Sequence, residues 1–465
     1  MAESVPLQLS PEAMRALGYR AVDLVVDHLT ALPDLPVGRR TDPATLAALL
    51  DEPPPETGRD PDAVLERLRR DVLDHTLHVN HPRFFAFVPS PGNYVGAVGE
   101  LLAAGFNVFA GTWFGGSGAA ALELVTLGWL RDWCGLPATA GGLLVSGGSV
   151  ANLTALAVAR QARLPDGPAG AVVYDSDQTH SAVDRALRVL GFAPDQLRRL
   201  SADAAGRLPV AALAAEVAAD RAAGRTPFCV VANAGTVNTG AVDPLPELAD
   251  FCRDEGLWLH ADAAYGGGAV LCPAGRAALR GLERVDSLAL DPHKWLFQPF
   301  EMGCVLVREE RHLSAAFDVR PEYLRDVHRE RIGEVNFGDR GIQLTRSARA
   351  IKLWLSIQVF GLQAFRDAVA VGLAHAELAE RVLRESGGWE IVTPAQLGIV
   401  TFRAGDDRVT AGLVESALAD GFALLSSTRL GGRPALRLCT INPRTTEADI
   451  RETVARLGDL AARLE

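Results

Sequence analysis

Apolar residues recur at helical spacing at both ends of the chain, with an alternating strand and helix pattern between them. Over residues 11–33 the apolar stripe follows Ser10 and Pro11, which suit the N-cap and the first helical position. A second helix is predicted over about 61–77, after a proline-rich connector. Because these segments show no strand pattern, we predict a helical arm, residues 1–85, that packs on another surface such as a partner subunit.

The central part alternates short apolar runs with amphipathic stretches. Strands joined by helices form parallel βαβ units, so the pattern predicts an α/β fold with an open sheet covered on both faces. Ligands bind at the carboxyl ends of the strands in such sheets. Strands are expected near 143–145, 171–174, 197–200, 228–232, 258–261 and 287–290, and helices near 152–163, 181–190, 210–223 and 245–255.

The C-terminal part predicts a smaller α/β unit. A charged, irregular stretch from Phe317 to about Gly341 precedes it, and this stretch is either a solvated loop or an active-site lid. A long helix is expected from about Thr345, followed by strands near 399–403 and 435–439 and helices near 362–385, 410–419 and 447–464. The predicted units are the arm 1–85, a large domain 86–345 with a mobile loop at about 320–342, and a small domain 346–465.

Polar residues follow five of the predicted strands, and we expect them to meet at one edge of the sheet. The segment Ser146-Gly147-Gly148-Ser149 is a glycine turn before a helix, where backbone N–H groups and the positive helix end can bind an anion. It matches neither common nucleotide-binding motif. The polar segments are 146–149, 177–180, 235–236, Asp262 and 291–294.

Lys294 is unusual because only Lys294 and Lys352 are lysines among 46 lysine and arginine residues. A guanidinium stays protonated in proteins, whereas a partly desolvated amine can attack a carbonyl as a Schiff-base nucleophile. Lys294 follows a predicted buried strand and Pro292. The alternative is an ordinary lysine at a strand end.

The composition argues against several classes of function. The 465 residues are 48% apolar, enough for two or three structural units. A net charge of −11 and a pI near 5.5 argue against partners such as nucleic acid or an anionic membrane. We also see no secretory signal and no run of 18 apolar residues. Six scattered cysteines indicate reduced thiols in the cytoplasm.

His75, His78 and His81 recur every third residue, a spacing that a metal site could use. No cysteine joins them, and His81-Pro82 ends the predicted helix. We therefore predict no metal.

An amine, an acid, an imidazole and an anion site together suit an aldehyde cofactor with a phosphate, namely pyridoxal 5'-phosphate. Lys294 would hold the aldehyde, and Asp262 would accept a hydrogen bond from the pyridine nitrogen. His180 would stack on one face of the ring, and Ala264 would pack against the other. The phosphate would be held by Ser149 and Thr236.

Four motifs resemble, in order and spacing, those of the group II pyridoxal-phosphate-dependent amino-acid decarboxylases, most closely the aromatic-L-amino-acid decarboxylase branch. The resemblance extends from the Pro11 helix through 437–444. It implies fold type I, like aspartate aminotransferase, with a mostly parallel seven-stranded sheet, a small C-terminal domain and an N-terminal arm. It also implies a homodimer with shared active sites. The motifs are SGGSVAN at 146–152, DQTHS at 177–181, HADAAY at 260–265 and DPHKW at 291–295.

The resemblance implies decarboxylation of an L-amino acid through a Lys294 aldimine and a quinonoid, with an aromatic substrate. The implied catalytic positions are Lys294, His180, Asp262 and Phe337. The implied cofactor-binding residues are Gly148, Ser149, Val150, Ala151, His180, Thr236, Asp262, Ala264, His293 and Lys294. The substrate candidates, which are either pocket wall or ordinary core, are Phe84, Phe85, Phe109 and Trp113.

Phe337 departs from the family pattern. The mobile loop of the aromatic decarboxylases carries a tyrosine that protonates the carbanion, and counting back from the next helix places Phe337 there. In plant relatives the same change gives an aldehyde synthase that consumes O2, so this is the alternative function. Tyr323 or His328 could instead supply the proton. An aminotransferase is a second alternative, since Lys294 and Asp262 would also serve that reaction.

Two further positions differ from relatives. Val237 stands where some members have a second threonine near the cofactor, and Asp291 replaces an asparagine of animal members. An acid beside a phosphate is unfavourable unless it faces away, so we assign Asp291 no phosphate contact.

Overall fold

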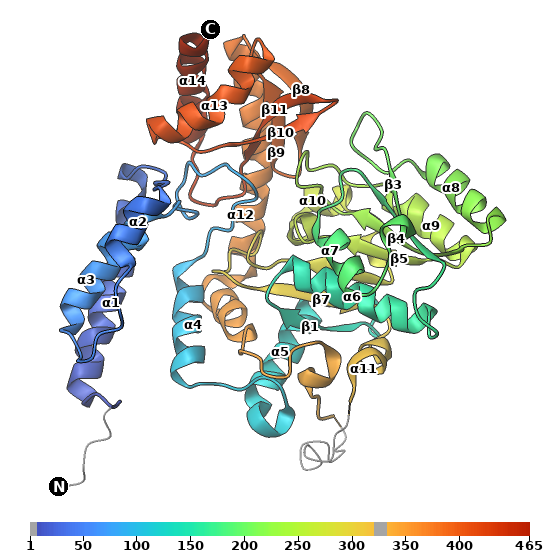
Figure 1. The fold of residues 1–465 in the computed structure, drawn as a ribbon, viewed down its shortest axis with the longest axis horizontal. Helices are drawn as coiled ribbons and strands as arrows, with labels where there is room; N and C mark the ends of the chain where they lie inside the picture. The colour runs from blue at the N-terminus through green and yellow to red at the C-terminus, as the bar shows by residue number, and fades with distance from the viewer. Residues whose placement is uncertain (1–6, 320–332) are drawn as a thin grey trace.

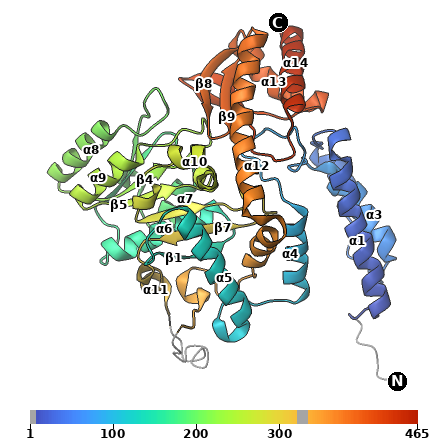
Figure 2. The same ribbon diagram turned by 180° about the vertical axis from the view of Figure 1, so that it is seen from behind.

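The computed structural model describes residues 7–319 and 333–465. Figures 1 and 2 show a seven-stranded sheet with its helices, a four-stranded sheet with its helices, and N-terminal helices along one side. The mostly parallel large sheet confirms the predicted fold class.

The large sheet has the strand order β1-β7-β6-β5-β4-β2-β3. β7 is antiparallel to β1 and β6, and the other neighbours are parallel. β7 was not predicted, because no amphipathic helix separates it from β6 and so the alternating pattern fails there. The strands are β1 (Gly141–Val145), β2 (Ala171–Ser176), β3 (Leu197–Leu200), β4 (Thr226–Asn233), β5 (Trp258–Asp262), β6 (Ser287–Leu290) and β7 (Gly303–Val307).

Helices pack against this sheet as the βαβ pattern requires. α6 contacts β1, β5, β6 and β7, whereas α8 contacts β3 and β4 and α9 contacts β4 and β5. α6 begins at Gly148, four residues before the predicted start, so the glycine turn itself forms its first turn. The helices are α5 (Trp113–Trp133), α6 (Gly148–Arg163), α7 (Ala182–Val189), α8 (Val210–Ala222), α9 (Leu245–Glu255), α10 (Pro273–Ala278) and α11 (Arg311–Phe317).

The second sheet is antiparallel, in the order β10-β11-β9-β8. The inner strands β9 and β11 were predicted, but β8 and β10 were missed. Both are edge strands with half-exposed side chains, so their apolar pattern is weak. The elements are β8 (Glu390–Gln396), β9 (Ile399–Arg403), α13 (Asp407–Asp420), β10 (Ser426–Leu430), β11 (Arg433–Cys439) and α14 (Glu447–Leu464).

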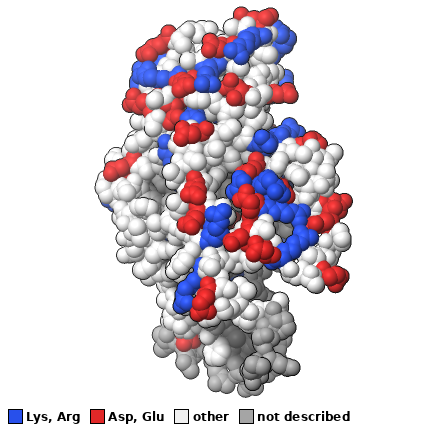
Figure 3. All heavy atoms as spheres, turned by 90° about the vertical axis from the view of Figure 1, so that its left-hand side faces the viewer, with Lys and Arg blue, Asp and Glu red and all other residues white. Residues whose placement is uncertain are grey.

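The N-terminal helices differ from the prediction in detail. α1 ends at Ala31, α2 (Pro43–Leu50) was not predicted, and α3 ends at Asp71. Residues 84–89 form no strand; Phe84 makes a single bridge to Leu424. In Figure 3, cationic and anionic side chains are interspersed on the face that carries these helices. The elements are α1 (Pro11–Ala31), α2, α3 (Pro61–Asp71) and α4 (Tyr94–Gly105).

The long helix α12 (Ala350–Ser386) connects the two sheets. Among the described residues it is the one helix whose length and composition would allow it to cross a membrane. It is interrupted at Gly361 and packs against α4, α5, α14 and β8.

Candidate active site

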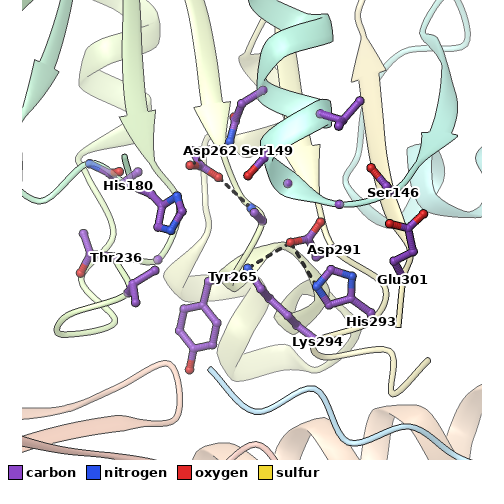
Figure 4. Close-up of a pocket in the computed structure, with 18 of the residues that line it drawn as sticks. Ser146, Ser149, His180, Thr236, Asp262, Tyr265, Asp291, His293, Lys294 and Glu301 are labelled. Atoms are coloured by element: carbon purple, nitrogen blue, oxygen red, sulfur yellow. Dashed lines mark hydrogen bonds and ion pairs between the residues drawn. The ribbon is translucent and has the colours of Figure 1, made fainter. Parts of the chain in front are cut away.

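A cavity of about 340 Å³ lies at the carboxyl ends of β1, β2, β4, β5 and β6 (Figure 4). All five polar segments predicted from the strand ends contribute to it. Of the proposed cofactor residues, Ala151 alone does not line it, because its side chain is buried in the core. The lining residues are 146–150, Asn152, Gln178, His180, Asn233, 235–237, Asp262, Ala264, Tyr265, Asp291, His293, Lys294 and Glu301.

Lys294 points into this cavity from the turn after β6. Its backbone N–H donates to Asp291 O at 3.0 Å, and its Nζ lies 3.0 Å from Asp291 Oδ2. The lysine side chain is 16% exposed, so its amine remains reachable from the cavity. Figure 4 shows both side chains on the same side of the cavity.

Asp291 lines the cavity and faces Lys294. Its carboxylate lies between Lys294 and His293, whose Nε2 is 3.6 Å from Oδ2. A Cβ added to Gly148 would lie 2.9 Å from Oδ2, so the carboxylate also lies at the positive end of α6. Within the described ranges, Oδ1 has no hydrogen-bond partner. The acid serves as the ion-pair partner of Lys294.

His293 has a defined tautomer. Met302 N donates to its Nδ1 at 3.2 Å, so a neutral ring carries its hydrogen on Nε2, toward Asp291. Burial lowers the pKa of His293, an effect that Asp291 opposes. The neutral form is therefore favoured at pH 7.

Asp262 lies at the end of β5 and is 7% exposed. Its Oδ1 accepts from Ala264 N at 3.1 Å, and its Oδ2 accepts from Asn152 Nδ2 at 3.1 Å. Both contacts favour a charged carboxylate. Asn152 belongs to the recognised SGGSVAN motif, yet its role could not be inferred without the contact between α6 and β5.

Thr236 and His180 lie on the opposite side of the cavity in Figure 4. Thr236 Oγ1 lies 2.9 Å from Thr239 Oγ1, and Gly235 before it has φ +105°, which favours glycine. His180 Nδ1 accepts from Ala182 N at 3.2 Å, which orients the ring. These side chains can therefore contact a flat ring and its substituents in the cavity.

Arg437 of β11 holds the Thr236 loop and was missed from sequence. It is 4% exposed and donates to Val237 O and, at 3.0 Å, to Asn238 O. It also donates to Ser426 Oγ at 2.9 Å. No local pattern identifies such a residue, because its partners lie in other parts of the chain.

The four aromatic substrate candidates do not line the cavity of the same chain. Phe84 and Phe85 are 3% and 1% exposed and pack in separate clusters with Leu424 and with the small sheet. Phe109 and Trp113 lie at the start of α5, where Trp113 N donates to Asn336 Oδ1 at 3.0 Å.

Phe337 is also outside that cavity. It is fully buried, with the guanidinium groups of Arg340 and Arg346 about 5.5 and 5.0 Å from its ring centre. The neighbouring Gly338 N donates to Gly111 O at 2.8 Å, so Phe337 lies beside the Phe109–Trp113 segment. The alternative proton donors Tyr323 and His328 lie outside the described residues.

The histidines that recur every third residue contact different partners. His75 Nδ1 bonds Thr41 Oγ1, the His78 ring lies against His28, and His81 Nε2 bonds Leu35 O. Across residues 7–319 and 333–465, no cluster of three or more His, Cys, Asp or Glu suits a metal ion.

The donor set of the cavity fits pyridoxal phosphate. It offers an amine for an aldehyde, a carboxylate acceptor for a ring nitrogen, and helix N–H groups for a phosphate. Together with the mostly parallel sheet, this defines a pyridoxal-phosphate enzyme of fold type I.

Comparison with known proteins specifies the family. The pyridoxal-dependent decarboxylase conserved domain matches residues 43–405. An aromatic-L-amino-acid decarboxylase of Bacillus atrophaeus is 51% identical over 98% of this chain and 97% of its own. A phenylacetaldehyde synthase of Arabidopsis thaliana is 31% identical, covering 96% and 95%. A crystal structure of Oryza sativa TDC with PLP and tryptamine has TM-score 0.93, 30% identity, and coverage of 99% and 100%.

The chain belongs to the pyridoxal-dependent decarboxylase family. It is a pyridoxal-phosphate-dependent amino-acid carboxy-lyase, as the resemblance implied.

Proposed function

We propose that this enzyme decarboxylates an aromatic L-amino acid to the corresponding amine. One observation carries the proposal: the Lys294 amine shares a single cavity with Asp262, His180 and the N-terminus of α6. The aromatic substrate is supported by the 51% identical relative, which is named an aromatic-L-amino-acid decarboxylase.

The residues that line the cavity have separate proposed roles. Lys294 would hold the cofactor through its amine, and Asp291, 3.0 Å from Nζ, would stabilise the lysine when it carries a charge. Asp262 would accept a hydrogen bond from the pyridine nitrogen, while His180 and Ala264 would lie against the two faces of the ring. Pyridoxal phosphate, when bound, accepts the electron pair left by departing CO2. The substrate would have to be held with the bond from Cα to its carboxyl carbon perpendicular to the ring, so positioning by the protein would select the reaction.

We also propose that the enzyme is a homodimer in which the partner completes each active site. Apolar residues of α1 remain exposed in a single chain, among them Met14, Tyr19 and Val25 at 49%, 68% and 43%. A hollow of about 820 Å³ lies between α1 and the segment that leads into α4. A second copy would cover the arm and would bring Phe109 and Trp113, which are not fully buried, to the other chain's cavity.

The proposed division into an arm (1–85), a large domain (86–345) and a small domain (346–465) follows the N-terminal helices, the seven-stranded sheet and the four-stranded sheet.

We further propose a cytoplasmic location. The six cysteines all fall in the described ranges and are buried free thiols, as expected in a reducing compartment.

An aldehyde synthase is the second candidate. Phe337 supports it, because phenylalanine has no proton to donate. The phenylacetaldehyde synthase relative is 31% identical, which is lower than the 51% of the decarboxylase. We therefore place amine formation first.

A panel of L-amino acids tests both candidates, with CO2, amine, O2 uptake and peroxide measured together. We expect CO2 and amine from Tyr, Phe, Trp or DOPA, without O2 uptake, and no turnover of Glu or 2,4-diaminobutyrate. CO2 with ammonia and peroxide would favour the aldehyde synthase. Turnover that needs a keto acid and releases no CO2 would contradict both.

Lys294→Arg provides the matched control for this panel. Arginine keeps the positive charge beside Asp291 but cannot form a Schiff base. We expect activity to fall by at least about 10³-fold and the cofactor absorbance that borohydride abolishes to disappear. Wild-type behaviour of this variant would overturn the assignment of Lys294.

A further inference from the structure

Asp262 ends a chain of hydrogen bonds that runs from the cavity into the core. Beyond the Asn152–Asp262 bond, Asn152 Oδ1 lies 2.7 Å from His260 Nε2. Ser287 Oγ then lies 2.9 Å from His260 Nδ1 and 2.9 Å from Trp258 Nε1. These residues come from α6, β5 and β6, and each is buried.

The donors and acceptors along this chain of hydrogen bonds all fit one direction. An indole N–H can only donate, so Ser287 Oγ accepts from Trp258 and its own hydrogen is left for His260 Nδ1. Burial lowers the pKa of His260 to about 4, so the ring is neutral at pH 7 and has one N–H. That hydrogen is on Nε2 and is donated to Asn152 Oδ1. Asn152 must then present its NH2 group to Asp262.

The opposite direction leaves groups unsatisfied. Turning the Asn152 amide would place its oxygen against the Asp262 carboxylate, two acceptors facing each other. His260 would then have to donate from Nδ1 to Ser287, which already accepts from Trp258. The serine hydrogen would lose its partner in this chain, an arrangement that buried polar groups avoid.

We propose that Asn152, His260, Ser287 and Trp258 are positioning residues that hold the Asp262 carboxylate, as a hydrogen-bond acceptor, aimed at the cavity. This rests on the proposed role of Asp262 toward the pyridine nitrogen. Because Asn152 and Ala264 N both donate to it, the carboxylate holds negative charge and keeps a free lone pair for the ring N–H. His260 and Ser287 do not line the cavity, so they act through Asn152.

The tautomer of His260 is the first test and needs no cofactor. We expect ¹⁵N NMR of the histidine-labelled full chain to show His260 with hydrogen on Nε2 and neutral at pH 6, assigned by loss of its signal in His260→Phe. Hydrogen on Nδ1, or a protonated ring at pH 6, would overturn the proposal whatever the enzyme's activity.

Cofactor binding and the pH titration of the cofactor's absorption band in the holoenzyme provide the second test. Asn152→Leu removes the donor to Asp262, so we expect the cofactor Kd to rise about tenfold and the spectral midpoint to move by about one pH unit. Ser287→Ala should change the cofactor Kd and the spectral midpoint in the same directions as Asn152→Leu, but by less. Ser356→Ala is the matched control, since it removes a fully buried hydroxyl from α12, outside this chain of bonds.

Asp262→Asn distinguishes a failure of the proposed role of Asp262 from a failure of the positioning proposal. If it leaves the spectrum and the cofactor Kd unchanged, the proposed role of Asp262 fails. If it changes both while Asn152→Leu and Ser287→Ala behave like Ser356→Ala, only the positioning proposal fails.

Discussion

The two lysines of this chain have opposite surroundings. Lys294 faces a cavity and pairs with one carboxylate, whereas Lys352 is 1% exposed and donates to Pro299 O and Glu301 O at 3.0 and 2.8 Å. Lys352 also pairs with Glu100, so its amine is fully engaged. Both lysines were visible in the sequence, but only the tertiary contacts distinguish an amine that faces a cavity from one that is enclosed by its partners.

His81 provides a residue-scale test of pH dependence. Burial lowers its pKa from 6.5 to about 4. The folded state therefore binds fewer protons than the unfolded state between these values, so stability is lost as pH falls from about 6.5 toward 4. His81→Gln should reduce the stability loss between pH 7.5 and pH 5 by about 2 kcal/mol in urea unfolding. An equal loss in both proteins would contradict the assignment.

At the scale of elements, a buried ion pair connects α5, β1 and the segment before α12. Glu123 Oε1 accepts from Arg346 Nη2 at 2.6 Å and from Leu144 N at 2.8 Å, and both charged side chains are almost completely buried. Arg346 also donates to Ala110 O at 2.9 Å. The pair thus supports the segments around Phe337 and Phe109.

Breaking one member of this pair should be costly. Glu123→Gln leaves the buried guanidinium without its counter-ion, and we expect a loss of about 3–5 kcal/mol in the free energy of unfolding. The Glu123→Leu/Arg346→Leu double variant should cost less than the sum of its single changes. Glu452→Gln breaks an exposed pair with Arg456 and should cost less than about 1 kcal/mol. Similar losses at both pairs would refute this account.

At the scale of the whole molecule, α1 has an apolar face that is exposed in a single chain. In Figures 1 and 2 the N-terminal helices lie along one side, apart from the large sheet. α1 has no buried residue, although its sequence has the apolar stripe of a packed helix. Only a second surface can bury that stripe.

The dimer prediction follows from this face. Met14→Asp/Val25→Asp places two carboxylates on one side of α1, and we expect dimer dissociation to become at least about 100-fold more favourable. Analytical ultracentrifugation should show the wild type near twice 49.4 kDa and the variant shifted to monomer, with activity lost in parallel. Ala455→Asp, an exposed apolar-to-acid change on α14, should remain dimeric. A monomeric, active wild type would contradict the proposal.

The sequence by itself determined the class of fold, the cofactor and the lysine, because these depend on local patterns. Alternating apolar runs specify βαβ units, and polar residues after successive parallel strands must meet at one edge. The tertiary structure decided what depends on residues far apart in the chain. It buried Phe337, paired Glu123 with Arg346, and connected Asp262 through Asn152 to His260. Spacing along one chain encodes none of these contacts, because each joins elements that meet only when the sheet and its helices pack.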